Sequence, residues 1–360
     1  MSVRRARPAR PARHMSPKLR SYARGALASL FALSALAVPS HSHAQTPATP
    51  PAPAQANRGQ VQEVHFHTPA LGSDKRMLVY LPPAYHADPT RRFPVAYYLH
   101  GAFGSESDWV RLASLDVVMD SLVRAGMPQM IVVMPDGDDS WYTTWNTLPN
   151  ASLCRELVPE GQLIETYCVG WPRYDDYIAR DVVRQVDSTF RTLAAREHRG
   201  IGGLSMGGYG AIALALQYPG VFAAAASHSG ALAPIWGSRG GPVRGESLPS
   251  MSEVREAYGD NLWRRIQPAF GRDSAGWLAR DPGERAIALW RGDRERFPAL
   301  FADVGRDDFL LDQSRRFRDT IRGLGASITY SEWSGSHSWE YWSAHVPESL
   351  AWMAALIAPK

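Results

Sequence analysis

A short glycine–serine sequence, Gly203-Leu-Ser-Met-Gly207, constrains the fold of this chain more than any other feature. An apolar run precedes it, and an alanine- and leucine-rich run, which favours a helix, follows it. This G-x-S-x-G pattern is typical of a serine at the apex of a sharp turn between a strand and a helix. The flanking glycines remove side chains that would block the turn, and the helix directs its N-terminal amides at the serine. We expect Ser205 to be a nucleophile; the alternative is an ordinary glycine-rich turn.

Strand and helix patterns alternate on both sides of this turn, which predicts an α/β fold with a mostly parallel central sheet and helices on both faces. Two antiparallel strands are expected to open the sheet. Continuous apolar runs favour strands buried on both faces. The expected strands, besides the one before Ser205, cover 61–66, 76–81, 93–99, 130–134, 221–229, 299–304 and 327–331. The expected helices, besides the one after Ser205, cover 115–126, 174–191, 310–324 and 344–357.

We expect one catalytic domain over residues 60–358. Two less regular stretches, 141–173 and 232–296, interrupt the alternation. We interpret them as insertions that lie over the active site like a lid.

The N-terminus has the features of a secretory signal peptide. Residues 1–44 contain eight Lys and Arg and no Asp or Glu, and an apolar run covers 25–38. Ser42 and Ala44 supply small residues for cleavage after about Ala44. Translation from Met15 would still give a complete leader, and a retained membrane anchor is the alternative. The pattern predicts a secreted or periplasmic protein, joined to its leader by a Pro/Ala-rich linker at 45–59.

The positive charge of the full sequence belongs mainly to this leader. Without residues 1–44 the chain keeps 31 of its 39 basic residues against 35 acidic ones, a net charge of −4. The balance therefore gives no support to a nucleic-acid partner. No internal apolar segment approaches the ~20 residues of a membrane-spanning helix, so no stable span is expected once the leader is removed.

Cys154 and Cys168 are the only cysteines. In an exported chain such a pair predicts a disulfide, although two unrelated buried thiols are the alternative. Neither cysteine has the spacing of a metal site with a nearby histidine. We expect neither a metal nor another cofactor.

A serine nucleophile needs a base, and the base needs an acid to orient it. Asp307 and Asp308 follow the strand expected at 299–304, and His337 follows the strand expected at 327–331. We expect His337 to be the base. One of the two aspartates is expected to cap the helix that begins near Leu310, and the other to be the acid, with Asp308 favoured.

The loop after the strand at 93–99 is expected to supply part of an oxyanion hole. The amides of Ala102 and Met206 are our candidates, with the Phe103 amide as the alternative to Ala102. We expect His100 to brace this loop, with simple packing as the alternative. Four aromatic residues are candidate substrate contacts, although aromatic packing is the alternative role: Phe103, Trp109, Trp339 and Trp342.

Taken together, these motifs resemble the putative-esterase branch of the α/β-hydrolases. That branch includes feruloyl esterases, S-formylglutathione hydrolases, enterochelin-type esterases and mycolyltransferases. The resemblance covers about residues 60–355 and rests on five segments: 98–109, 134–137, 203–211, 305–310 and 335–342. It implies an α/β-hydrolase fold with Ser205 as nucleophile, Asp308 as acid and His337 as base. It also implies an oxyanion hole made by the amides of Ala102 and Met206.

The chain departs from the family pattern in two places. Phe103 is expected to narrow the acyl side of the site, and the stretch 141–173 is longer than the family core needs. We therefore predict an exported serine esterase that hydrolyses small or polysaccharide-linked carboxylic esters through an acyl-enzyme. One alternative is acyl transfer to a sugar or lipid hydroxyl. The other is a non-catalytic glycan-binding protein, in which Trp339, Tyr341 and Trp342 would stack on sugar rings, although aromatic packing is the alternative role.

Overall fold

The computed structural model describes residues 58–146, 151–158, 162–237 and 247–360. These residues belong to one compact unit, Pro51–Lys360. The predicted leader at 1–44 and nearly all of the predicted linker at 45–59 lie outside the described residues.

A single eight-stranded sheet forms the centre of this unit, in the order β1-β2-β4-β3-β5-β6-β7-β8. The strands β1 and β2 pair antiparallel, and β2 pairs antiparallel with β4. All the remaining pairs are parallel. This confirms the predicted mostly parallel sheet with two antiparallel strands at its start. The strands are β1 (Gln60–Thr68), β2 (Ser73–Leu81), β3 (Val95–Leu99), β4 (Ile131–Pro135), β5 (Arg199–Leu204), β6 (Ala224–His228), β7 (Ala299–Gly305) and β8 (Thr329–Trp333).

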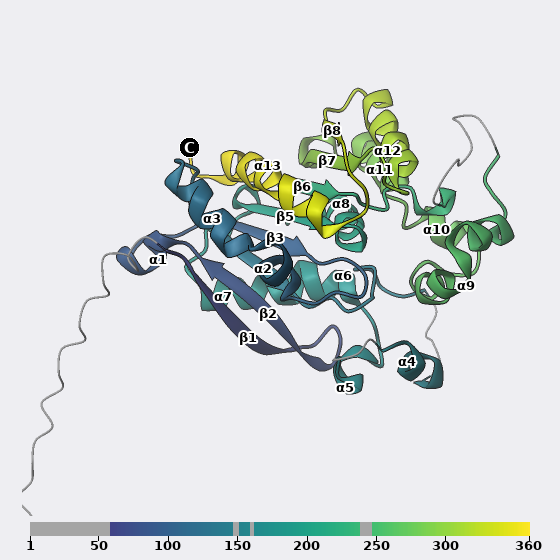
Figure 1. Ribbon diagram of the computed structural model, residues 1–360, viewed down its shortest axis with the longest axis horizontal. Helices are drawn as coiled ribbons and strands as arrows, with labels where there is room; N and C mark the ends of the chain where they lie inside the picture. The colour runs from purple at the N-terminus through teal and green to yellow at the C-terminus, as the bar shows by residue number, and fades with distance from the viewer. Residues whose placement is uncertain (1–57, 147–150, 159–161, 238–246) are drawn as a thin grey trace, which may run out of the picture. The chain divides into compact units, whose positions relative to one another are not determined.

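Helices cover both faces of the sheet (Figure 1). The α-helices are α1 (Pro83–Ala87), α2 (Asp108–Ala113), α3 (Leu115–Arg124), α4 (Ala151–Leu157), α5 (Ile164–Tyr167), α6 (Tyr174–Asp176), α7 (Val183–Thr189), α8 (Met206–Gln217), α9 (Met251–Phe270), α10 (Ser274–Leu278), α11 (Pro282–Gly292), α12 (Leu311–Gly323) and α13 (Trp339–Ile357). A π-helical turn, η1 (Tyr177–Val182), joins α6 to α7. Short 3₁₀ turns are η2 (Arg196–His198), η3 (Pro234–Trp236) and η4 (Arg294–Arg296).

The strand β3 shows how the sequence produces two hydrophobic cores. Successive strand side chains point to opposite faces, so Val95, Tyr97 and Leu99 enter one core. Ala96 and Tyr98 enter the other. The first core includes apolar side chains of η1, α7, α8 and α12, and the second includes those of α3 and α13. Apolar side chains at every position of this strand are therefore buried, as its continuous apolar run predicts.

Several element ends differ from the sequence expectation. The last helix was expected from residue 344 but begins at Trp339, because Ser338 caps it by accepting a hydrogen bond from the Tyr341 amide. The helix expected over 174–191 ends at Thr189 and contains the π-helical turn. A hydrophobic period alone does not specify either a cap or an inserted residue.

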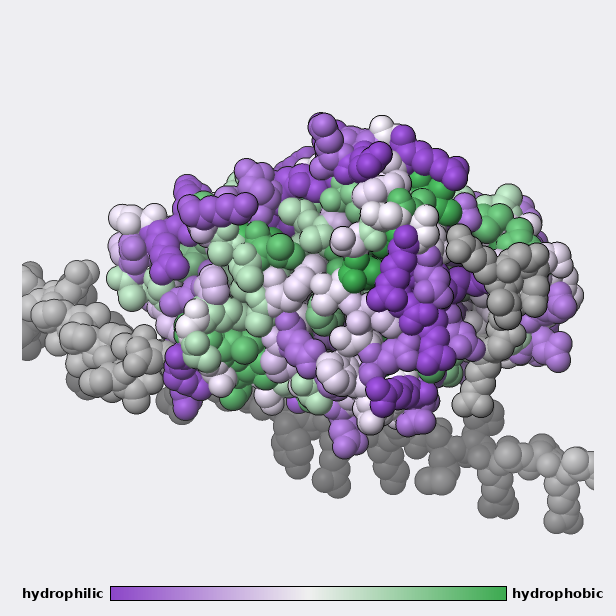
Figure 2. Space-filling view, turned by 90° about the horizontal axis from the view of Figure 1, so that it is seen from above, coloured by the Kyte–Doolittle hydropathy of each residue, from purple (hydrophilic) through white to green (hydrophobic). Residues whose placement is uncertain are grey.

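Cys154 and Cys168 form the predicted disulfide, with a Cα–Cα distance of 5.8 Å. Within the described ranges, no helix is both long and apolar enough to cross a membrane. The face shown in Figure 2 carries separate hydrophobic patches among hydrophilic residues rather than one continuous apolar surface.

Candidate active site

Ser205 occupies the sharp turn between β5 and α8, with φ 52° and ψ −117°. Such a conformation is costly for a residue other than glycine and persists only where its surroundings fix it. The Ser205 amide donates to the His228 carbonyl of β6, and the Ser205 carbonyl accepts from the Tyr209 amide of α8. A Cβ atom at Gly207 would overlap the backbone carbonyl oxygens of Leu99 and His100. The turn therefore needs glycine at 207, as the motif indicates.

The imidazole of His337 connects Ser205 to Asp308. The Nε2 atom of His337 lies 2.9 Å from the Oγ atom of Ser205. The Nδ1 atom of the same ring lies 2.9 Å from Asp308 Oδ2 and 3.1 Å from Oδ1. An ionised carboxylate only accepts hydrogen bonds, so it selects the tautomer with its proton on Nδ1. That leaves Nε2 free to accept a proton from the serine hydroxyl.

Two backbone hydrogen bonds hold the loops that carry Asp308 and His337 against each other. The Arg306 amide donates to the Trp333 carbonyl, and the Asp307 amide donates to the Gly335 carbonyl. These loops follow the adjacent parallel strands β7 and β8. The carboxyl ends of parallel strands meet at one edge of a sheet, which brings the acid and the histidine together.

Of the two aspartates expected near the start of α12, Asp308 is the one that contacts His337. Its Oδ1 atom accepts from the Leu310 amide at the start of α12, while the carboxylate also contacts His337. The Asp308 side chain is buried, whereas Asp307 is exposed. The expectation that one aspartate caps the helix was wrong: Leu310 is the N-cap residue of α12, and no side chain caps this helix.

The loop after β3 approaches Ser205 from the other side. Ala102 and Phe103 line the same cavity as Ser205. Phe103 has φ 64°, and its amide donates to Asp139 Oδ1 over 2.6 Å. That amide is therefore already engaged with the protein. Among the residues that the structure describes, the amides of Ala102 and Met206 donate to no protein acceptor. This geometry favours Ala102 over Phe103 as an oxyanion donor.

His100 stabilises the same loop through the hydrogen bonds of its imidazole. Its Nε2 atom accepts from the Gly137 amide over 2.8 Å, so Nδ1 carries the proton and donates to the Gly101 carbonyl over 2.8 Å. The Tyr142 hydroxyl donates to the His100 carbonyl. The imidazole thus connects the loop after β3 with the loop after β4.

A buried charged cluster lies behind this brace. The ammonium group of Lys75 contacts the carboxylates of Asp136 and Asp138, and all three side chains are buried. The Tyr174 hydroxyl also donates to Asp138. Burial and the neighbouring charge of Asp136 raise the pKa of Asp138 to about 6. Buried charges need such partners, so the cluster fixes the start of the loop after β4.

A cavity of about 480 Å³ opens at Ser205 and His337. This volume lies within the usual range for small-molecule sites. Of the predicted substrate contacts, Phe103, Trp339 and Trp342 line the cavity. Further lining residues, which the sequence analysis did not identify, include Arg111, Leu112, Trp141, Tyr258, Leu262 and Phe309.

The structure does not bring Trp109 to this cavity. Its side chain is fully buried, and its indole N–H donates to the Leu99 carbonyl over 3.1 Å. Its ring packs edge-on against Tyr98 and Trp339. Trp109 therefore packs inside the protein next to the loop after β3. Its role is aromatic packing, the alternative to substrate contact.

Hydrophobic periodicity could not predict that α9 contributes side chains to the cavity. Tyr258 and Leu262 are four residues apart, but Gly259 between them has φ 71° and interrupts the helix. Phe309 could not be recognised as a cavity residue from the sequence, because it lies in the short connection between Asp308 and α12. The centroid of its ring lies 4.5 Å from that of the His337 imidazole. The imidazole centroid lies 4.9 Å from the ring centroid of Trp342.

Comparisons with known proteins identify similar esterases. A family described as putative esterase matches residues 68–353. An acetyl esterase from Caldicellulosiruptor saccharolyticus is 25% identical over 306 residues, which are 82% of this chain and 98% of that protein. Esterase Rv1288 of Mycobacterium tuberculosis is 29% identical over 282 residues, or 76% of this chain. The match spans about half of that relative, 54% of its length.

Solved structures share the arrangement of strands and helices. A ferulic acid esterase superposes with a TM-score of 0.62 at 22% identity, covering 84% of this chain and 99% of that one. At that identity the likeness establishes the fold alone. The expected α/β-hydrolase fold is thereby confirmed.

Proposed function

This chain belongs to the putative esterase family, and from that membership we propose that it is an exported serine esterase with Ser205, His337 and Asp308 as its catalytic triad. The observation that carries the proposal is the unbroken hydrogen-bonded chain from Ser205 Oγ through the His337 ring to Asp308. It joins three segments that are far apart in sequence, at the mouth of a cavity.

In this proposal His337 Nε2 removes the proton from Ser205 while Oγ attacks the carbonyl carbon of the ester. The tetrahedral intermediate collapses, the alcohol leaves with the proton from the imidazolium, and an acyl-enzyme remains. His337 then takes a proton from water as the water oxygen attacks the acyl carbon. The second tetrahedral intermediate collapses, the bond to Ser205 Oγ breaks, and the imidazolium returns its proton to Oγ, which releases the acid and restores the enzyme. Asp308 keeps the imidazole in the required tautomer and stabilises the imidazolium.

The amides of Ala102 and Met206 are the proposed oxyanion donors. Met206 is the first residue of α8, so its amide also contributes to the positive end of the helix dipole. Losing one such donor typically costs about 2.7–4 kcal/mol of transition-state stabilisation.

The cavity supports a small ester with an apolar or aromatic part. Aromatic side chains of Phe103, Phe309 and Trp342 lie beside Ser205 and His337 on the cavity wall. One relative is named as an acetyl esterase, and one structural neighbour is named as a ferulic acid esterase. We therefore propose carboxylic esters of this range as substrates, free or linked to a polysaccharide, and export by the leader at 1–44.

Acyl transfer to a sugar or lipid hydroxyl would use the same acyl-enzyme and differ only in the acceptor. Hydrolysis is our primary proposal because the relatives named above are esterases. Product analysis with added alcohols distinguishes the two. A purely glycan-binding role would give no function to the hydrogen bonds that connect Ser205, His337 and Asp308.

Ser205→Ala in the leader-free protein tests the proposal. Turnover of p-nitrophenyl acetate and of methyl ferulate should fall to background while the melting temperature is unchanged. Ser188→Ala, at an exposed serine of α7, is the matched control and should keep full activity. Retained activity in Ser205→Ala would refute the assignment.

A further inference from the structure

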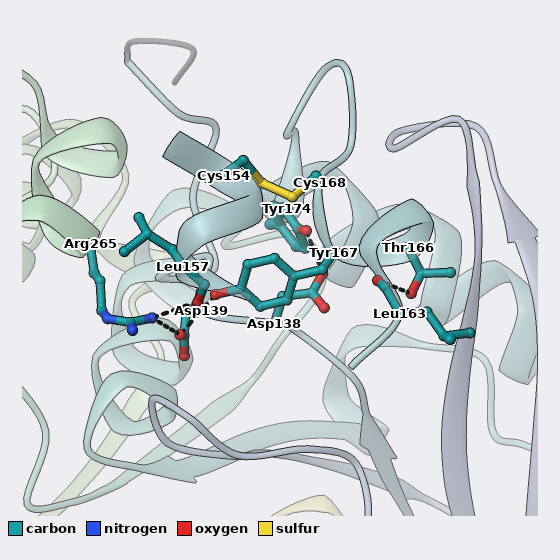
Figure 3. Close-up of a disulfide and its surroundings, with 10 residues drawn as sticks. All are labelled: Asp138, Asp139, Cys154, Leu157, Leu163, Thr166, Tyr167, Cys168, Tyr174 and Arg265. Atoms are coloured by element: carbon teal, nitrogen blue, oxygen red, sulfur yellow. Dashed lines mark hydrogen bonds and ion pairs between the residues drawn. A yellow bond between two sulfur atoms is a disulfide. The ribbon is translucent and has the colours of Figure 1, made fainter. Parts of the chain in front are cut away.

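Asp139 lies in the loop after β4, and its buried carboxylate joins three segments that are distant in sequence. Its Oδ1 atom accepts from the Phe103 amide over 2.6 Å. Its Oδ2 atom accepts from the Tyr167 hydroxyl over 2.8 Å and from Arg265 Nη1 over 3.2 Å. Figure 3 shows Tyr167 and Arg265 converging on this carboxylate.

Each partner is itself anchored. Tyr167 directly precedes Cys168, which forms the disulfide with Cys154. Arg265, from α9, also donates to the Leu157 carbonyl over 2.9 Å, and its guanidinium lies 4.8 Å from the centre of the Phe103 ring. The disulfide-closed segment and α9 are therefore both connected to the loop after β3 through one carboxylate.

The contact with Phe103 bears directly on the proposed oxyanion donor. The Ala102 N–H and the Gly101 carbonyl belong to one planar peptide unit and point in opposite directions. His100 fixes that carbonyl from one side. Asp139 fixes the next peptide unit through the Phe103 amide, where φ is 64° and the backbone is strained. The direction of the Ala102 N–H is thus set from both sides.

We propose that Asp139 is a positioning residue for the reaction at Ser205, holding the oxyanion loop through the Phe103 amide. Tyr167 and Arg265 in turn hold the carboxylate. Arg265 also balances the negative charge, which would otherwise oppose the developing oxyanion. The inference rests on the proposed function, because it requires that the loop after β3 stabilises an oxyanion.

Three variants test this role: Asp139→Ala, Asp139→Asn and Tyr167→Phe. Asp139→Ala should lower kcat about 10- to 100-fold, since small displacements at a reacting centre cost factors of that order. KM should change less than about threefold, because a contact to the oxyanion is made mainly in the transition state. Affinity for an alkyl boronic acid, which forms a tetrahedral adduct with the serine, should fall by the same factor as kcat.

The conservative variants separate positioning from folding. Asp139→Asn keeps an acceptor oxygen for the Phe103 amide and should restore part of the lost kcat. Tyr167→Phe removes one hydroxyl and should lower kcat about fivefold, the effect of a single hydrogen bond. Both are expected to fold, and they decide the question if Asp139→Ala does not.

Asp120 provides a matched control. Its buried carboxylate also accepts from a backbone amide, that of Gly59, and from a tyrosine hydroxyl, that of Tyr80. It lies on α3 and does not line the cavity. Asp120→Asn should lower the melting temperature and leave kcat and boronic acid affinity unchanged.

Wild-type kcat and boronic acid affinity in both Asp139→Asn and Tyr167→Phe would overturn the proposal. So would a loss that appears only in KM, or an equal loss of kcat in Asp120→Asn. None of these results would affect the assignment of Ser205. Conversely, retained activity in Ser205→Ala refutes the proposed function itself, so the two failures are distinguishable.

Discussion

The Nε2 atom of His337 lies 2.9 Å from the Oγ atom of Ser205, across a sequence separation of 132 residues. The two side chains follow different strands, β8 and β5, which are separated in the sheet by β6 and β7. The other ring nitrogen of His337 contacts Asp308. This relationship makes the identity of the acid directly testable.

Asp308→Asn should lower kcat about 10³- to 10⁴-fold, because an amide favours the wrong imidazole tautomer. Asparagine can still accept from the Leu310 amide, so the start of α12 should persist. The adjacent Asp307→Asn is the control and should change kcat by less than about twofold, since Asp307 is exposed. Steady-state kinetics on a p-nitrophenyl ester compare the two. Similar losses in both variants would contradict the assignment of the acid.

The disulfide should contribute substantially to stability. It closes a loop with a sequence separation of 14 residues, for which chain entropy gives about 3 kcal/mol. Denaturant unfolding of a Cys154→Ser/Cys168→Ser double variant should show a loss of this order. A reductant should destabilise the wild type and leave the double variant unaffected. Equal sensitivity of the two proteins to reductant would count against this prediction.

Stability should depend on pH through Asp281, which caps α11. Burial raises the pKa of Asp281 to about 7, above its ordinary value of 3.8, although it accepts hydrogen bonds from the Glu284 and Gly283 amides. The folded protein therefore keeps this proton after the unfolded chain has lost it. Stability from this group is complete below about pH 4 and is lost as the pH rises to about 7.

The comparison variant for this effect is Asp281→Asn, which retains the cap and cannot ionise. Its melting temperature relative to the wild type should rise between pH 4 and pH 8. The slope for one proton is at most about 1.4 kcal/mol per pH unit. A constant difference between the two proteins across this range would show that Asp281 does not titrate there.

Gly207→Ala should damage the turn at Ser205. The new Cβ atom would overlap the backbone oxygens of Leu99 and His100, which cannot move without disturbing β3. Overpacking of this kind typically costs about 1–3 kcal/mol. Gly220→Ala adds a Cβ with nothing within 4 Å, so it should change the free energy of unfolding by less than about 0.5 kcal/mol. Denaturant unfolding of both variants measures the contrast.

Much of this architecture could be predicted because its signals are local. A glycine-flanked serine after an apolar run indicates the turn, and continuous apolar runs such as 130–134 indicate buried strands. The rule that partner loops follow parallel strands then placed Asp308 and His337 near Ser205. Their hydrogen bonds agree with that placement, while their catalytic roles remain a proposal.

The rest depended on contacts between distant segments. Nothing near Phe103 in sequence indicates that its amide is held by Asp139, 36 residues away. Because Gly259 interrupts α9, helical periodicity could not predict that the side chains of Tyr258 and Leu262 point in the same direction. Trp109 was expected at the substrate, but a large side chain beside a loop can equally turn inward, and only the packing of the second core decides this.

Labelling with a fluorophosphonate tests the central claim most directly, because the reagent reacts with an activated serine hydroxyl. Mass spectrometry of the leader-free protein should show one adduct, mapped to the peptide containing Ser205, with loss of ester hydrolysis in the same proportion. His337→Ala should abolish labelling while the protein stays folded. Labelling at another serine, or full hydrolytic activity in a protein labelled completely at Ser205, would contradict the account.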